Sequence, residues 1–251
     1  MSIVFKDVTK TYDKGKDILQ GLDLTIAADS IYCLLGKNGA GKSTLLNILT
    51  NLIGPTSGEV LLDDLSYSTD AMPIKKVTGV QCQFNQLIGE LNARDFLMWT
   101  GLLYGMDKQQ IATQTEHLTN FFFDEQDDLS GPAARYSAGM QRKLVLCSAV
   151  MHKPRYLVLD EHFANLDPIA CGKLCEFLKA YRSPERVVVV SSHDLLYVDK
   201  IATHIGILDR GALVFNDTMA RFKKDGLTID QELLKHLAMP ETDSSLINLL
   251  V

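Results

Sequence analysis

The chain has 251 residues, 46% of them apolar and 22% charged, which is ordinary for a globular α/β domain with a large core. Its net charge of −6 at pH 7 argues against a general nucleic-acid binder. The longest apolar-looking stretch, residues 96–104, is far shorter than the roughly 18–20 residues of a membrane helix, and we expect no signal peptide.

The first eighty or so residues predict two kinds of β structure. Alternating polar and apolar residues indicate half-buried strands, whereas the wholly apolar run at 31–35 indicates a strand in the core. A helix pattern follows that run from about residue 42 to residue 50. Strands are expected over 3–8, 18–27, 31–35, 59–62 and 77–82.

A glycine-rich loop joins the core strand to this helix. Residues 36–43 read G-x-x-x-x-G-K-S, the phosphate loop of nucleotide-binding proteins. Its glycines let backbone N–H groups turn onto phosphate oxygens, and the positive end of the helix faces the same oxygens. Lys42 can reach the β- and γ-phosphates, and the Ser43 hydroxyl can ligate Mg²⁺. The expected ATP-binding residues are Gly36, Asn38, Gly39, Ala40, Gly41, Lys42, Ser43 and Thr44.

Helical spacing replaces the strand pattern between residues 92 and 153, which indicates a helical insertion within a parallel-sheet domain. Strands and helices alternate after it. The expected helices cover 94–104, 111–122, 139–151, 168–181 and 195–201, and the expected strands cover 155–160, 186–191, 204–208 and 212–215. Residues 228–251 look like an amphipathic helical tail with Leu233, Leu234 and Leu237 on one side.

The strand over 155–160 ends in two carboxylates. Because the carboxyl ends of parallel strands point into the ligand crevice, Asp160 and Glu161 should meet the phosphates. Asp160 is expected to hold Mg²⁺ directly or through its water, and Glu161 to polarise the water that attacks the γ-phosphate. An apolar run before Asp-Glu is common by itself. This Asp-Glu pair is a more specific signal because it lies about 120 residues after the phosphate loop, beyond a helical insertion.

Residues 136–143 read Tyr-Ser-Ala-Gly-Met-Gln-Arg-Lys. They resemble the signature motif, usually Leu-Ser-Gly-Gly-Gln, of the nucleotide-binding domains of ATP-binding cassette (ABC) transporters. The resemblance covers nearly the whole chain and is closest to multidrug, antibiotic and lipid exporters of the A-type kind. In that family the signature of one subunit closes on the ATP held by the other, which implies this role for Ser137, Ala138, Gly139 and Met140. By itself the segment could be an ordinary helix N-terminus capped by Ser137.

The same resemblance implies roles for four further residues. Gln83 matches the Q-loop glutamine that senses Mg²⁺ or water, with Gln81 as a nearby rival. Asp167 matches the D-loop at the subunit interface, and His193 matches the switch histidine that contacts the γ-phosphate. Tyr12 matches the aromatic residue that stacks on adenine.

The chain also departs from the family pattern. Tyr136 replaces the signature leucine, Ala138 its first glycine and Met140 its glutamine, while His162 replaces the proline that usually follows the catalytic glutamate. The methyl group of Ala138 could reduce turnover, because backbone and phosphate approach closely there. None of these changes removes a group that handles phosphate or Mg²⁺, so we expect an active ATPase.

The resemblance implies an α/β fold, with a P-loop NTPase core of mixed or parallel sheet, an N-terminal antiparallel β subdomain and an inserted helical subdomain. Residues 1–225 are expected to form the ATPase domain, with the insertion at about 92–153, and residues 226–251 the helical tail. The five cysteines form no C-x-x-C pair, and reduced thiols are expected, with Cys33 and Cys147 in the core.

The implied function is an ATP-binding and ATP-hydrolysing transporter subunit on the cytoplasmic face of the membrane. Two such domains, identical or related, would close around two ATP molecules with Mg²⁺ and drive export of a drug, peptide or lipid-like substrate through a separate transmembrane permease. Residues 96–104 are either a docking surface for that permease or the core of the helical subdomain.

Two alternatives remain. The first is a soluble ABC ATPase acting on the ribosome or DNA, against which the one phosphate loop, the lack of sustained heptads and the negative charge all argue. The second is a weakly catalytic or non-catalytic regulatory cassette. Glu161 and His193 argue against it, while Ala138 and His162 leave it open.

Overall fold

The computed structural model describes residues 1–12, 15–82, 87–224 and 226–237, which form two sheets. One is antiparallel, in the order β2-β1-β4-β5. The other has the order β10-β9-β3-β8-β7-β6 and is parallel except for its edge strand β10. The strands are β1 (Ser2–Tyr12), β2 (Lys16–Ala27), β3 (Ser30–Leu35), β4 (Ser57–Leu62), β5 (Leu65–Ser66), β6 (Thr78–Gln81), β7 (Tyr156–Asp160), β8 (Val187–Ser191), β9 (His204–Asp209) and β10 (Ala212–Thr218).

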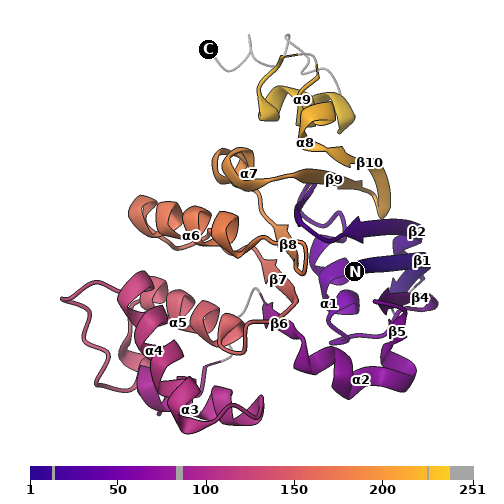
Figure 1. Ribbon diagram of the computed structural model, residues 1–251. Helices are drawn as coiled ribbons and strands as arrows, with labels where there is room; N and C mark the ends of the chain where they lie inside the picture. The colour runs from indigo at the N-terminus through magenta and orange to yellow at the C-terminus, as the bar shows by residue number, and fades with distance from the viewer. Residues whose placement is uncertain (13–14, 83–86, 225, 238–251) are drawn as a thin grey trace.

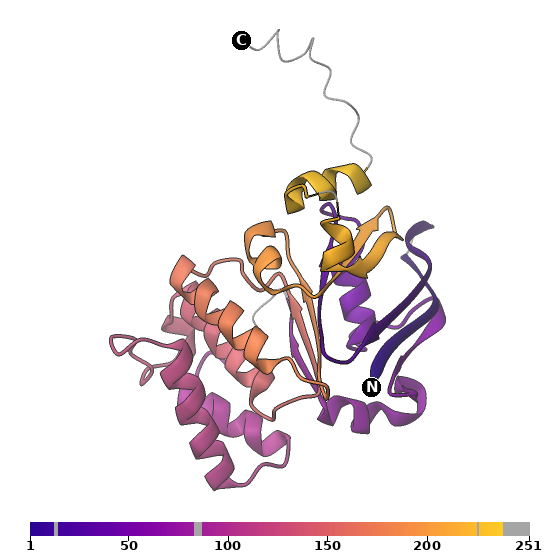
Figure 2. The same cartoon turned by 45° about the horizontal axis from the view of Figure 1, so that its top comes forward.

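The helices separate into three groups (Figure 1). α1 packs between the two sheets, with α2 beside β5. α5 to α7 lie on the other face of the parallel sheet, with α3 and α4 packed against α5, and α8 and α9 lie together beyond β10 (Figure 2). None of the helices in the described residues is long and apolar enough to cross a membrane. Their bounds are α1 (Lys42–Leu49), α2 (Tyr67–Lys76), α3 (Ala93–Leu103), α4 (Lys108–Phe122), α5 (Ala138–Val150), α6 (Pro168–Tyr181), α7 (Leu195–Ile201), α8 (Met219–Phe222) and α9 (Ile229–His236), with a 3₁₀ turn η1 (Ala133–Arg135).

The parallel strands are buried on both faces, which explains their uninterrupted apolar sequences. In β3, Tyr32 and Leu34 pack towards α1 and the antiparallel sheet, whereas Ile31 and Cys33 pack towards the helices of the opposite face. β7 and β8 alternate in the same way. The cysteines are free thiols, with Cys33 and Cys147 fully buried, as expected.

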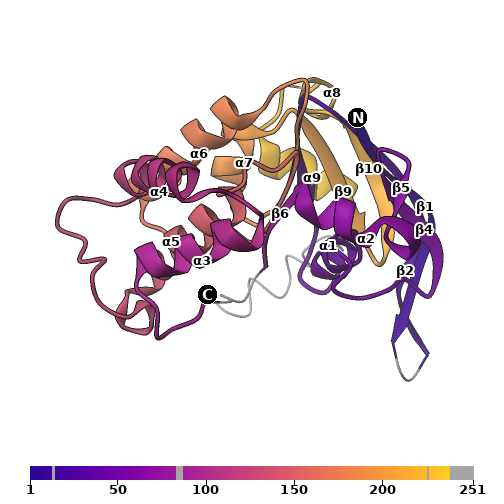
Figure 3. The ribbon, with the colours of Figure 1, turned by 60° about the horizontal axis from the view of Figure 1, so that its bottom comes forward.

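Helices α3, α4 and α5 pack on one another, away from the antiparallel sheet (Figure 3). Side chains cap their first turns, namely Asn92, Asp107 and Ser137. The Tyr136 hydroxyl accepts the N–H of Ala93 at 3.0 Å and donates to the carbonyl O of Leu129 at 2.7 Å. The phenol therefore ties the start of α5 to the start of α3. The boundaries drawn for the helical insertion stay predictions.

Several features differ from the sequence expectations, among them the short elements β5 and α8, which are not predicted. Helix α2 is not predicted, because Ile74 is its one fully buried side chain and Pro73 interrupts its hydrogen bonding. In the tail, the placement of Leu234 beside Leu233 and Leu237 is wrong, since Leu234 is 49% exposed whereas the other two pack against the core. A step of one residue turns a helix by about 100°, which moves Leu234 off the buried side. Residues 238–251 lie outside the described chain.

Candidate active site

The phosphate loop between β3 and α1 requires glycine at two positions. Gly36 has a φ of +147°, and a Cβ there would lie 2.2 Å from the carbonyl O of Leu208 on β9. Gly41 has a φ of +110°, and its Cβ would lie 3.0 Å from the carbonyl O of Ile18 on β2. The loop is thus pressed against both neighbouring strands. The first turn of α1, which is wholly described, contains no acidic residue, so this helix N-terminus favours an anion.

Lys42 folds back over the loop that precedes it. Its Nζ donates to the carbonyl O of Gly36 at 2.8 Å and to that of Lys37 at 3.3 Å. Burial lowers the pKa of Lys42, and the negative charges of Glu161 and Asp160 oppose that shift. The fold therefore brings the phosphate-loop lysine close to both carboxylates predicted at the end of β7.

Strands β7 and β8 end side by side and support these carboxylates. Asp160 and Ser191 are register partners, and Ser191 Oγ donates to Asp160 Oδ1. Ser191 also accepts the backbone N–H of Glu161, through Oγ at 3.0 Å and through its carbonyl O at 3.2 Å. Glu161 has a left-handed backbone with a φ of +49°, so the chain turns sharply directly after the strand.

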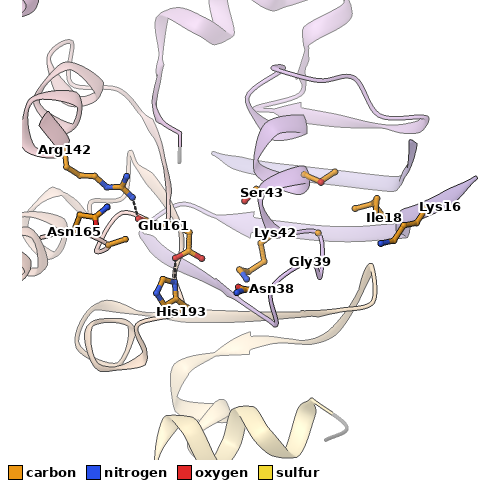
Figure 4. Close-up of a pocket in the computed structure, with 13 residues that line it drawn as sticks. Lys16, Ile18, Asn38, Gly39, Lys42, Ser43, Arg142, Glu161, Asn165 and His193 are labelled. Atoms are coloured by element: carbon orange, nitrogen blue, oxygen red, sulfur yellow. Dashed lines mark hydrogen bonds and ion pairs between the residues drawn. The ribbon is translucent and has the colours of Figure 1, made fainter. Parts of the chain in front are cut away.

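Two side chains meet Glu161 from different elements. His193 Nδ1 lies 2.6 Å from Glu161 Oε2, and the histidine is largely exposed while the carboxylate is mostly buried. Arg142, on α5, donates from Nη2 to the backbone carbonyl O of Glu161. Figure 4 shows both contacts as dashed lines, with Lys42 and Ser43 across the cleft from Glu161.

A cleft of about 760 Å³ opens between the phosphate loop and Glu161, within the usual range for small-ligand sites. It brings eight predicted residues together and adds five to which the sequence assigned no ligand contact. The predicted ones are Asn38, Gly39, Gly41, Lys42, Ser43, Thr44, Glu161 and His193, and the additional ones are Lys16, Ile18, Arg142, Ala164 and Asn165. Two of these five lie in recognised segments, since Arg142 belongs to the stretch that resembles the signature motif and Asn165 opens the Asn-Leu-Asp segment that resembles the D-loop.

Other predicted residues lie outside this lining. Ser137 caps α5, and both Ser137 and Ala138 are exposed on the surface. Asp167 caps α6 by accepting the N–H groups of Ile169 and Ala170 at 2.9 Å each. These bonds, that of Ala170 first, lower the pKa of Asp167. Both segments are helix N-termini open to solvent in the isolated chain.

The adenine and Q-loop assignments stay predictions. Tyr12 ends β1 opposite Lys16, is 44% exposed, and carries Lys10 Nζ 5.2 Å from its ring centroid. It is not among the described residues that line the cleft. Gln83 lies outside the described residues, whereas its rival Gln81 is fully buried in β6.

The oxygen donors of the site suit Mg²⁺. Proteins commonly hold this ion through one or two side-chain oxygens, with phosphates and water completing the octahedron. The Ser43 hydroxyl at the start of α1 and the Asp160 carboxylate at the end of β7 provide such a pair. Within the described residues there is no group of three or more His, Cys, Asp or Glu side chains that could hold a metal unaided.

Comparisons with known proteins identify the family of the chain. The family model for ABC transporters matches residues 19–164. The chain is 28% identical over 209 residues to the lantibiotic transport ATP-binding protein SrtF of Streptococcus pyogenes, covering 83% of this chain and 87% of that protein. It is 27% identical over 227 residues to the bacitracin transport ATP-binding protein BcrA of Bacillus licheniformis, covering 89% and 72% respectively. It is also 30% identical over 226 residues to the mouse (Mus musculus) retinal-specific phospholipid-transporting ATPase, covering 86% of this chain and 9% of that protein.

Solved structures share the fold. An ATP-binding subunit of an ABC transporter superposes with a TM-score of 0.87 at 22% identity, covering 94% of this chain and 99% of the other. A dimeric ATP-binding cassette in a post-hydrolysis state, bound to ADP and Pi, superposes with a TM-score of 0.78 at 23% identity, covering 86% and 98%. The α/β fold expected from the sequence is thereby confirmed. The chain belongs to the ABC transporter family, as an ATP-binding and ATP-hydrolysing subunit.

Proposed function

We propose that this subunit works as one of a pair and powers the export of an antibiotic-like or lipid-like substrate through a separate membrane subunit. The names of the relatives support this class of substrate, since they include lantibiotic, bacitracin and phospholipid transport proteins. The subunit would act on the cytoplasmic face of the membrane, where ATP is available.

The pairing of Glu161 with His193, across the cleft from Lys42, is the observation that carries the proposed chemistry. With Oε2 hydrogen-bonded to His193, the other carboxylate oxygen of Glu161 can accept a proton from the attacking water as general base. Nδ1 is the nitrogen that meets Glu161, so His193 donates to a γ-phosphate oxygen from Nε2 in its imidazolium form, in which both ring nitrogens carry a proton.

Lys42 is prepared to bind phosphate. Its ammonium group already rests on two loop carbonyls, and an ATP phosphate would replace these neutral acceptors with charged ones, which hold a cation more strongly. The N–H groups at the start of α1 add their partial positive charge on the same side. Binding therefore depends on Lys42 and the loop, whereas hydrolysis depends on Glu161.

Ser43 and Asp160 are the proposed Mg²⁺ ligands, with Asp160 acting directly or through a water molecule and Gln83 as a third contributor. When bound, the ion neutralises charge on the phosphates and favours loss of the γ-phosphoryl group. The Ser191 hydroxyl fixes the orientation of the Asp160 carboxylate through its hydrogen bond.

Two features support the paired state. Ser137 and Ala138, at the start of α5, are exposed and lie outside the cleft of their own chain. Ile169, beside the Asp167 cap of α6, is 73% exposed although it is apolar. In a pair, the signature of each chain would close over the ATP of the other, and the D-loop segment would lie between them.

The side of α3 that faces away from the core is a candidate docking surface for the membrane subunit. Phe96 and Leu97 pack into the core, whereas the other side exposes apolar groups one helical turn apart. Residues 96–104 thus contribute to both of the predicted roles, core on one side and candidate docking surface on the other. The exposed side chains are Met98, Trp99, Leu102 and Leu103, which are 42–65% exposed.

The decisive experiment replaces Glu161→Gln and measures both ATP hydrolysis and ATP-dependent dimerisation. We expect hydrolysis to fall at least about 100-fold, because the general base is lost, while dimers accumulate with ATP and Mg²⁺. Glu176→Gln, an exposed change on α6, is the matched control. Unchanged hydrolysis in Glu161→Gln would refute the assignment of the base, and a persistent monomer would refute pairing with an identical chain.

A further inference from the structure

Arg142 is a buried charged residue of the cleft that the proposed chemistry does not use. It lies in the second turn of α5, is 5% exposed, and its guanidinium donates from Nη2 to the backbone carbonyl O of Glu161. Figure 4 shows this contact on the opposite side of Glu161 from His193. A buried cation is costly unless strong acceptors compensate for lost water, so this contact requires an explanation.

The backbone of Glu161 needs support. Its φ of +49° is uncommon for a residue with a side chain, because the Cβ crowds the carbonyl group. Ser191 restrains the N–H side of this residue with two acceptors, at 3.0 and 3.2 Å. Arg142 restrains the carbonyl side. Other elements therefore hold the peptide groups on both sides of the Glu161 Cα.

We infer that Arg142 is a positioning residue, which holds the Glu161 carboxylate at the γ-phosphate by fixing the carbonyl end of its left-handed backbone. Arg142 itself touches neither the transferred group nor the attacking water. Without its donor, the peptide after Glu161 can rotate, and the carboxylate then leaves its hydrogen bond with His193. This inference rests on the proposed role of Glu161 as the general base.

The position of Arg142 gives this contact a second consequence. Arg142 is on the same helix as Ser137, five residues away, so the two move together if α5 shifts. If α5 of one chain moves as it closes on the ATP of a second chain, the Arg142 side chain transmits this movement to the Glu161 carbonyl group of the first chain. Assembly at one site and alignment of the base at the other are then mechanically linked.

The test compares Arg142→Met with Lys143→Met. Both remove a buried cation from adjacent positions of α5, but Lys143 faces away from the cleft and pairs with Asp127 at 3.7 Å. We expect Arg142→Met to lower kcat about 10- to 100-fold, the usual effect of a displaced catalytic group, with KM and the Kd for ATP within about twofold. Lys143→Met should keep the kcat of the natural chain, and Arg142→Lys should recover part of the loss.

Two measurements keep the inference separate from misfolding and from failure of the proposed function. In a Glu161→Gln background, Arg142→Met should lower the residual turnover no further, because the positioned carboxylate is gone. An unchanged kcat in Arg142→Met, equal losses in Arg142→Met and Lys143→Met, or a matching loss of ATP affinity would overturn the inference. If Glu161→Gln itself hydrolyses ATP normally, the proposed function fails, whatever Arg142 does.

Discussion

The imidazole of His162, directly after Glu161, should make the fold sensitive to mild acid. His162 is 0% exposed, and neither ring nitrogen has a hydrogen-bond partner among the described residues. Burial, together with the nearby charge of Arg142, lowers the pKa of His162 from 6.5 to about 3. The native ring therefore stays neutral at pH values where the same ring in the unfolded chain takes up a proton.

The sign and size of the effect follow from this difference. A depressed folded pKa gives stability that is fully present above 6.5 and is lost as the pH falls towards 3. One pH unit in this window corresponds to about 1.4 kcal/mol, so a fall from pH 7.5 to pH 5 should cost about 2 kcal/mol through His162 alone. Replacement by leucine, of similar volume, removes this cost. It also removes two unpaired polar atoms, which should add about 1 kcal/mol at pH 7.5.

Urea unfolding at pH 5 and pH 7.5 measures the effect directly. His162→Leu should be more stable than the natural chain at both pH values, with a gap wider by about 2 kcal/mol at pH 5. The exposed His117 provides the matched control, because its ring stays in water in the folded and unfolded chains alike. If His162→Leu loses as much stability between the two pH values as the natural chain does, the burial argument is wrong.

Two further predictions concern the cleft and the docking side of α3. Lys42→Met should weaken ATP binding about 10- to 100-fold, measured by calorimetry, because it removes a charge-assisted hydrogen bond to phosphate. The same variant should keep its free energy of unfolding within about 1 kcal/mol of that of the natural chain. Tight ATP binding by Lys42→Met would contradict the assignment of Lys42 to phosphate binding. Trp99 is the one tryptophan of the chain, so its fluorescence emission reports on the exposed apolar side of α3. The emission should shift to shorter wavelength in detergent micelles that contain the candidate membrane subunit but not in empty micelles. An unchanged spectrum at full binding would exclude Trp99 from the interface.

The sequence predicts features that depend on short stretches of chain. The apolar runs of β3, β7 and β8 identify strands buried on both faces, and the carboxyl ends of such strands meet at one edge of a sheet. Asp160 and Glu161 could therefore be placed near the phosphate loop from the sequence, whereas His193 was assigned to the site through the family resemblance. Helix α6 is predicted with its observed bounds because Asp167 and Pro168 mark its start.

Features that depend on long-range packing were not predictable in this way. Arg142 lies in the segment that resembles the signature motif, but nothing in that segment predicts its contact with Glu161, which exists because α5 packs beside the end of β7. Lys16 and Ile18 enter the cleft because the antiparallel sheet lies against the phosphate loop, as the approach of the Ile18 carbonyl O to Gly41 shows. Neither arrangement has a marker in the local sequence.

Gly139 and Ala138 of the signature motif differ in whether a side chain affects the chain's own packing. A Cβ at Gly139 would lie 3.3 Å from the carbonyl O of Asn165, so a side chain at the second glycine of the motif would require a small shift within the chain itself. Ala138 is exposed, and the fold accommodates its methyl group at the start of α5. If the signature closes on the ATP of a second chain, as proposed, any penalty of Ala138 should arise at that nucleotide. Such a penalty would appear in the ATP dependence of pairing and leave the stability of the monomer unchanged.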